Sequence, residues 1–117
     1  MVEQANIDVS VVVPTHRRNE LLHRCLEALV TQDLSPDRYE ILVADDGASS
    51  DTRSFVQSWQ SRAAVRIHYV PVKLRGGPAR ARNAGWRRAR GRIIAFTDDD
   101  CIPERSWLRE AIAALDS

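Results

Sequence analysis

The feature that most constrains the fold is a short apolar run at residues 93–96, which leads through Thr97 into three consecutive aspartates at 98–100. A β-branched apolar run of this length predicts a buried strand. Ionised carboxylates are costly to bury unpaired, so we expect the acids to lie where this strand reaches the surface. Ligands of open α/β sheets bind at the carboxyl ends of strands, and adjacent acids suit an oxygen-preferring cation, Mg²⁺ or Mn²⁺. A loop that merely caps the next helix is the alternative.

Two earlier apolar runs end in a similar way. Residues 8–13 form a β-branched run that stops at Pro14 and Thr15, and residues 39–44 form one that stops at Asp45 and Asp46. A third run at 65–70 is followed by Pro71. Each of these runs has the length and composition of a strand.

Helical patterns separate the predicted strands. The first has Asn19 as its expected cap and an apolar face at Leu21, Leu22, Cys25, Leu26, Leu29 and Val30. Ser49, Ser50 or Asp51 can cap a second helix, whose inward side chains are Phe55, Val56 and Trp59. A third is expected over about 78–89, where Ala81, Ala84 and Gly85 allow close packing, and a fourth is expected to start at Pro103, with Trp107, Leu108, Ala111, Ile112 and Leu115 on one face.

Strands that alternate with helices predict a single α/β domain with a mostly parallel, Rossmann-like sheet of about four strands. A chain of 117 residues is long enough for one such core. Because the carboxyl ends of parallel strands meet at one edge, we expect the polar residues after the first, second and fourth strands to converge on one crevice.

Charge is unevenly distributed along the chain. Between Thr52 and Thr97 there are eleven Lys or Arg and no acid, although the net charge is only +1. A basic segment facing an acidic cluster suits a phosphorylated, metal-bridged ligand, and it also suits nucleic acid.

No apolar run approaches the roughly 20 residues of a membrane span, and the first ten residues do not form a secretory signal. Because the two cysteines are widely spaced, we expect both thiols to be reduced and the domain to be cytoplasmic. An association with a membrane would come from other parts of a longer protein.

Four segments resemble the amino-terminal part of a family-two glycosyltransferase with the GT-A fold. They are residues 9–16 (VSVVVPTH), 43–52 (VADDGASSDT), 81–85 (ARNAG) and 89–100 (ARGRIIAFTDDD). Their order and spacing cover nearly the whole chain. His16 stands where the family more often has tyrosine, and Thr97 where it more often has leucine; neither position needs a carboxylate.

The resemblance implies a role for each candidate site residue. Pro14 and Thr15 would line the base pocket, and Asp46 or Asp45 would accept the imide N–H of uracil from a UDP-sugar donor. Asp98 would contact the ribose or a metal-bound water, and Asp100 would ligate Mg²⁺ or Mn²⁺. Further candidates are Asp99, which would turn toward the nucleotide or sugar, and Arg82, which would reach the base or phosphates or remain an exposed helix arginine.

The resemblance also implies what lies elsewhere. In inverting members the base that deprotonates the acceptor hydroxyl lies downstream of the acidic motif, so we expect it beyond Ser117. We therefore expect residues 1–117 to bind a nucleotide-sugar, to be unable to transfer the sugar efficiently alone, and to self-associate through an uncovered sheet edge.

Three other functions compete with this interpretation. The arginine-rich residues 75–92 would serve a nucleic-acid-binding module, although only Trp86 interrupts them as an aromatic. A sugar-nucleotide nucleotidyltransferase has a related fold, but its glycine-rich loop after the first strand is replaced here by residues 14–18 (PTHRR). A non-catalytic interaction domain that keeps only the fold is the third possibility.

Overall fold

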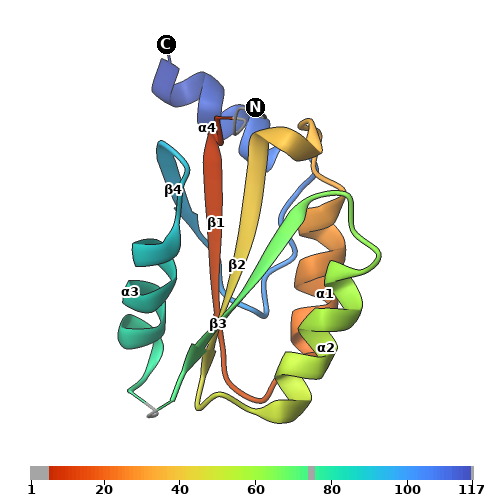
Figure 1. Ribbon diagram of the computed structural model, residues 1–117. Coiled ribbons are helices and arrows are strands. Elements are labelled where there is room, and N and C mark those ends of the chain that lie inside the picture. The colour runs from red at the N-terminus through yellow and green to blue at the C-terminus, as the bar shows by residue number, and fades with distance from the viewer. Residues whose placement is uncertain (1–5, 74–75, 117) are drawn as a thin grey trace, which may run out of the picture.

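The computed structural model describes residues 6–73 and 76–116, which form a parallel sheet with helices on both faces (Figure 1). The strands and helices follow one another as β1 (Val9–Thr15), α1 (Asn19–Val30), a 3₁₀ turn (Pro36–Arg38), β2 (Tyr39–Asp46), α2 (Ser50–Gln60), β3 (Arg66–Val72), α3 (Pro78–Arg88), β4 (Ile93–Phe96) and α4 (Trp107–Asp116). The predicted α/β architecture is confirmed.

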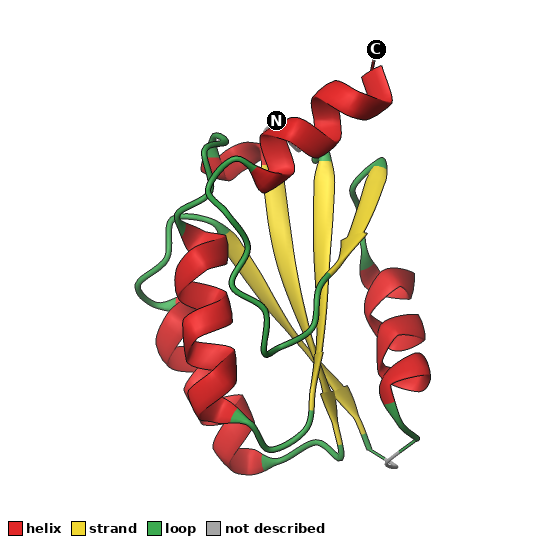
Figure 2. Cartoon of the chain, turned by 180° about the vertical axis from the view of Figure 1, so that it is seen from behind, coloured by secondary structure: helices red, strands yellow, loops and turns green. Residues whose placement is uncertain are grey.

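The four strands lie in the order β3-β2-β1-β4, and all three pairings are parallel. Val9 is in register with Tyr39 on one side and with Ile93 on the other. Helices α1 and α2 cover one face, α3 covers the other, and α4 lies near the amino ends of the strands (Figures 1 and 2). All carboxyl ends therefore meet at the opposite end of the sheet.

Successive side chains of β1 point to opposite faces of the sheet and so enter two separate hydrophobic cores. Val11 and Val13 are buried in the larger core beneath α1 and α2, while Val12 belongs to a smaller one beneath α3. The small residues of α3 permit close approach, as predicted: a Cβ added to Gly85 would lie 2.5 Å from Val12 Cγ1. Any larger residue at 85 would push α3 off the sheet.

The prediction of a buried last strand is wrong. Strand β4 is only half-buried, and the Phe96 side chain is 45% exposed. The reason is its position at the edge, where β1 is its one neighbour. Pro14 also does not end β1, which continues to Thr15. The backbone groups of Val12 point toward β4, since the Val12 carbonyl accepts from the Thr97 amide, and those of Pro14, two residues on, point to the same side. Pro14 lies beyond Val12, the last residue of β1 that pairs with β4, so its missing N–H interrupts no hydrogen bond of the sheet.

Two predicted helix starts are wrong as well. Asn19 is the first residue of α1 rather than its cap, and its side-chain oxygen accepts a 3.1 Å hydrogen bond from Thr52 Oγ1. The last helix starts at Trp107 rather than Pro103, since the Leu108 amide donates to Gln32 Oε1 at 3.0 Å and fixes the first turn there.

Other helix predictions hold in part. Ser49 is the cap of α2, as one of the expected alternatives, and accepts from the Thr52 amide. The apolar stripes are narrower than predicted, because Leu21 of α1 and Leu115 of α4 are exposed. Within the described residues, no helix is long and apolar enough to cross a bilayer.

Candidate functional site

A cavity of about 170 Å³ opens at the carboxyl end of the sheet. It brings together residues that follow β1, β2 and β4 with the start of α3. Its lining residues are Pro14, Thr15, His16, Arg18, Asp46, Pro78, Ala81, Asp98, Asp99 and Asp100. The expected convergence of three strand ends therefore occurs in the structure.

The acidic loop after β4 is held in place by its middle residue. Asp99 is only 4% exposed, and it accepts a 2.8 Å hydrogen bond from Thr15 Oγ1 and a 3.5 Å ion pair from Arg18. Beneath the loop, the Cys25 thiol donates to the Asp98 carbonyl at 3.6 Å. Burial first, and the nearby acids second, raise the pKa of Cys25 to about 12, so this thiol keeps its proton.

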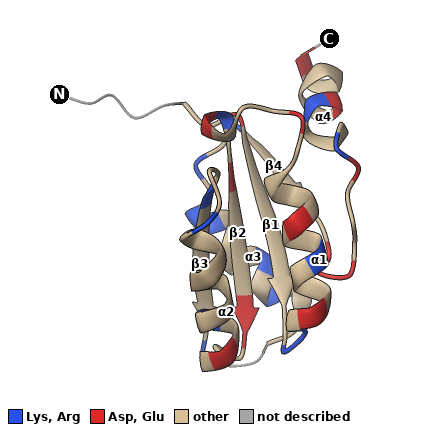
Figure 3. Ribbon diagram, turned by 90° about the vertical axis from the view of Figure 1, so that its right-hand side faces the viewer, with Lys and Arg blue, Asp and Glu red and all other residues tan. Residues whose placement is uncertain are grey.

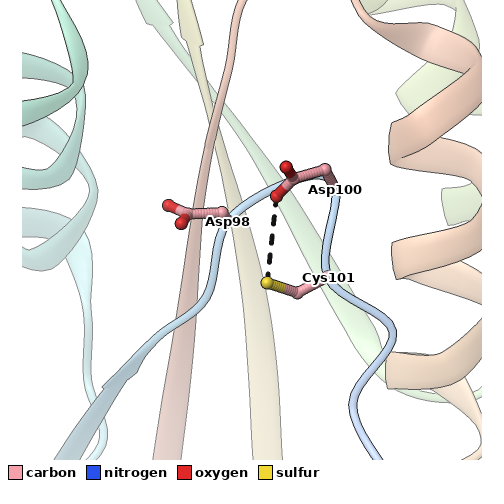
Figure 4. Close-up of side chains that lie close together, drawn as sticks. All are labelled: Asp98, Asp100 and Cys101. Carbon is pink, nitrogen blue, oxygen red and sulfur yellow. Dashed lines mark hydrogen bonds between the residues drawn. The ribbon is translucent and has the colours of Figure 1, made fainter.

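Fixing Asp99 inward leaves its two neighbours facing out. Asp98 and Asp100 are exposed, and with Cys101 they present three ligand atoms within 4.8 Å of one another (Figure 4). Two carboxylates at this separation have the donor chemistry that Mg²⁺ or Mn²⁺ requires, so the residues present fit the expected cation. The Cys101 sulfur lies 3.8 Å from Asp100 Oδ1 and is a softer donor than such ions prefer.

The acidic pair that ends β2, where the arrowhead of the strand is red in Figure 3, has the opposite environment. Asp45 is fully buried, and its Oδ2 accepts from Tyr69 Oη at 2.6 Å and from the Ser49 amide at 2.8 Å, while Oδ1 has no partner among the described residues. Burial raises the pKa of Asp45, an effect that these hydrogen bonds partly oppose. Asp45 does not line the cavity, so its contacts place it as a brace for the following turn.

Asp46 does line the cavity, but both of its oxygens already have donors. The Gly76 amide donates to Oδ1 at 2.9 Å and the Gly77 amide to Oδ2 at 3.1 Å. These contacts tie the end of β2 to the start of α3. Each carboxylate oxygen retains a second lone pair that a ligand N–H can use.

Two basic residues of the β1–α1 loop enter the site, although sequence reasoning assigned them no role there. His16 Nδ1 lies 2.6 Å from the Asp46 carbonyl, which only accepts, so Nδ1 carries the proton. Arg18 reaches Asp99 and also borders a larger cavity of about 800 Å³ between the amino ends of α1 and α2. The available signal was position, because both residues directly follow the end of a strand. The larger cavity contains none of the residues at 98–100.

Arg82 lies in a neighbouring cavity rather than in the one described above. This cavity, of about 570 Å³, is bordered by α3 and by the segment from β4 to Cys101, and it shares only Asp98 with the first. Arg82 is half-buried there, beside Trp86 and Phe96. A ligand held at Asp98 would be within the reach of both cavities.

Solved structures share this fold. TarS of Staphylococcus aureus, residues 1–349, in complex with UDP-GlcNAc matches with a TM-score of 0.85 and 26% identity, over 94% of this chain and 31% of that one. The mannosyltransferase PcManGT from Pyrobaculum calidifontis, in complex with GDP-Man and Mn²⁺, matches with a TM-score of 0.86 and 31% identity, over 96% of this chain and 33% of that one.

Sequence comparison points the same way. The glycosyltransferase AglE of Haloferax volcanii is 31% identical over 107 residues, which are 92% of this chain and 35% of AglE. The chain thus spans about a third of the length of these relatives. The family model for glycosyl transferase family 2 matches residues 10–117. Because that match covers nearly the whole chain, the protein belongs to family 2 of the glycosyltransferases, and its sheet is the amino-terminal part of their GT-A fold.

Proposed function

We propose that this domain binds a nucleotide-diphosphate sugar, UDP-linked, together with Mg²⁺ or Mn²⁺, and serves an inverting transfer of the sugar to an acceptor hydroxyl. The observation that carries the proposal is the placement of Pro14, Thr15 and the exposed carboxylates of Asp98 and Asp100 around one cavity. TarS with UDP-GlcNAc and PcManGT with GDP-Man and Mn²⁺ support it as similar folds.

The roles follow from the contacts. Asp98 and Asp100 would hold the cation, and Asp99 keeps them facing outward through its bond to Thr15. When bound, the cation would supply Lewis-acid stabilisation of the diphosphate leaving group. Pro14 and Thr15 would border the base, and Arg82 would approach the phosphates from the neighbouring cavity with its planar, bidentate fork.

The base of the nucleotide is the least constrained part of the proposal. Asp46 would accept the uracil imide N–H with the lone pairs that Gly76 and Gly77 leave free, whereas buried Asp45 would act by holding the turn beside it. Guanine also carries an imide N–H. A comparison of UDP with GDP is therefore part of the test.

Catalysis by residues 1–117 alone is not expected. We propose that these residues are the nucleotide-binding part of a GT-A domain and that the acceptor base lies outside them. The exposed edge of β4 and Phe96 beside it offer a surface for self-association, which sedimentation at increasing concentration would detect. Two free thiols, Cys25 and Cys101, are consistent with a reducing compartment such as the cytoplasm.

Calorimetric titration tests the proposal directly. We expect UDP to bind in the presence of Mn²⁺, GDP to bind more weakly, and Asp98→Ala and Asp100→Ala each to weaken UDP binding by roughly 100-fold or more, since each removes a direct ligand. Glu110→Gln, which changes an exposed acid on α4, is the matched control and should bind like the wild type.

The opposite results are equally informative. Equal affinity with Mn²⁺ and with EDTA would contradict the metal role while leaving a nucleotide site. Failure of the folded wild-type domain to bind either nucleotide would overturn the assignment. Detectable sugar transfer by purified residues 1–117 would contradict the proposal that the base lies elsewhere.

A further inference from the structure

A further polar cavity lies on the far side of the sheet from β4. It has a volume of about 330 Å³ and is bordered by α2, by the edge strand β3 and by the end of α3. Because α2 and α3 cover opposite faces of the sheet, the cavity spans the outer edge of β3. Its lining residues are Arg53, Gln57, Gln60, His68, Tyr69 and Arg88, and none of them lines the proposed nucleotide site.

The chemistry of this cavity is that of a receptor for an anion. Arg53 and Arg88 bring two guanidinium groups, and within residues 6–73 and 76–116 neither pairs with a carboxylate. The two glutamines and Tyr69 add hydrogen-bonding groups, and none of the described acidic residues lines the space. Two uncompensated arginines facing one cavity are unfavourable unless water or an anion solvates them.

Two buried acids contact lining residues without being among the lining residues themselves: Asp45 accepts from Tyr69 Oη, and Glu40 accepts from His68. Glu40 is 1% exposed, and its oxygens accept from Ser10 Oγ at 2.6 Å, from His68 Nε2 at 2.9 Å and from the Arg90 amide at 2.8 Å. Glu40 therefore holds the His68 ring, and within the described residues neither Arg53 nor Arg88 forms an ion pair with it.

The walls of the cavity are held by the fold. The Arg53 guanidinium lies 5.9 Å from the centre of the Tyr69 ring, and Tyr69 Oη is fixed by its 2.6 Å hydrogen bond to Asp45. Gln60 Nε2 donates to the Ile67 carbonyl at 2.8 Å, which covers part of the free edge of β3. A ligand would therefore meet Tyr69 and Gln60 already positioned, which lowers the entropic cost of binding.

We propose that this cavity is a separate binding site for a phosphate group, held between Arg53 and Arg88. Its volume admits a phosphate together with the alcohol to which it is esterified, so the same chemistry is offered by free inorganic phosphate and by a phosphate ester. The proposal is independent of the nucleotide site, because it shares no lining residue with it.

Nitrogen–proton correlation NMR of the full chain tests the proposal, with inorganic phosphate and glycerol phosphate as probes and chloride at equal ionic strength as reference. Both probes should shift the His68 and Tyr69 amide signals saturably, and the tighter of the two identifies the source. Arg53→Gln and Arg88→Gln should each weaken binding at least fivefold. Arg109→Gln, on α4 and paired with Asp33, should not.

Three results would overturn the proposal. These are unsaturable shifts that chloride reproduces, equal binding by the Arg53→Gln and Arg109→Gln variants, and shifts confined to residues 98–101. Preferential binding of a random DNA oligonucleotide, lost gradually with each arginine of α3 that is changed, would instead indicate a diffuse nucleic-acid surface. Both substituted arginines are exposed, so the variants should keep the wild-type melting temperature.

Discussion

The acidic pair that ends β2 and the acidic run that follows β4 look alike in sequence and differ completely in structure. Asp45 and Asp46 are buried, and their oxygens are used by a tyrosine and by three backbone amides. Asp98 and Asp100 are exposed, and only Asp99 between them is buried. The pair that ends β2 stabilises the turn that leads to α2 and the approach to α3, whereas the outer acids after β4 are free to meet a ligand.

The difference arises from the neighbours of each strand. Strand β2 lies between β1 and β3, so its end is surrounded by protein, and each acid there must find internal donors. Strand β4 is an edge strand, and the loop beyond it faces solvent on one side. Burial therefore decides which acids are structural.

The largest expected effect on stability comes from Glu40, a buried acid outside the two acidic segments compared above. Glu40→Gln places an amide among three donors, and we expect it to lower the free energy of unfolding by about 3 kcal/mol in urea titrations at neutral pH. A loss below about 0.5 kcal/mol would mean that buried acids in this fold are not stabilised by their partners.

The same residue predicts a pH dependence. Burial acts to raise the pKa of Glu40, but hydrogen bonds from His68, Ser10 and the Arg90 amide outweigh it and lower the pKa from about 4.5 to about 2. The stabilisation is therefore complete above pH 4.5 and is lost as the pH falls toward 2. Glu40→Gln should remove this part of the acid sensitivity, measured as unfolding free energy across that window.

Asp46→Asn should have the next largest effect. Both oxygens of Asp46 accept backbone amides, so an amide nitrogen at either position faces another donor, and we expect a loss of about 2 kcal/mol. Chemical denaturation provides the measurement, and Asp98→Asn is the control, with an expected change within about 0.5 kcal/mol. Equal losses at the two sites would remove the distinction between the acidic runs.

Asp99→Ala tests the buried residue within the exposed run. It removes the bonds from Thr15 and Arg18, and we expect about 1 kcal/mol of destabilisation and, if the outer acids hold the cation, roughly tenfold weaker Mn²⁺ binding. Thr15→Val, which deletes the donor alone, should weaken Mn²⁺ binding in the same direction. An unchanged Mn²⁺ affinity in both variants would show that Asp99 does not position its neighbours.

Asp45→Asn should have the smallest effect. Both hydrogen bonds reach Oδ2 and Oδ1 has none, so an asparagine with its oxygen at the Oδ2 position keeps both donors. Because burial raises the pKa of Asp45, its ionised form opposes folding at neutral pH, and the variant should equal or slightly exceed the wild type. That advantage should shrink as the pH falls and wild-type Asp45 gains a proton.

Much of the fold is local in the sequence and was predictable for that reason. The β-branched run of β1, the Ser49 cap and the small residues Ala81 and Gly85 each encode their own structure within a few residues. The half-burial of β4 was not predictable in this way, because it depends on which strand lies beside it, and strand order is a property of the whole sheet.

The site likewise has features that the sequence predicts and features that it does not. That polar residues after three strands meet in one cavity follows from parallel topology alone. The hydrogen-bond partners of those residues do not follow from topology, because the partners are distant in the sequence. Thr15 and Asp99 are 84 positions apart, and outside the site the hydrogen bond between Arg92 and Asp8 spans the same separation. Sequence reasoning could not choose between Asp46 and Asp45 for the nucleotide, because most of the contacts that occupy them come from Tyr69, Gly76 and Gly77, which no local pattern connects to them.

The central position of β1 has a consequence for how the chain acquires its structure. Residues 9–12 pair with residues 93–96, so one flank of β1 stays unpaired until residues 93–96 have been made by the ribosome. At typical rates of synthesis of about 5–20 residues per second, some 80 residues take about 4 to 16 s. During that time an apolar, unpaired strand edge is available to chaperones or to other nascent copies, so mistranslation or pausing before residue 93 should favour aggregation over folding.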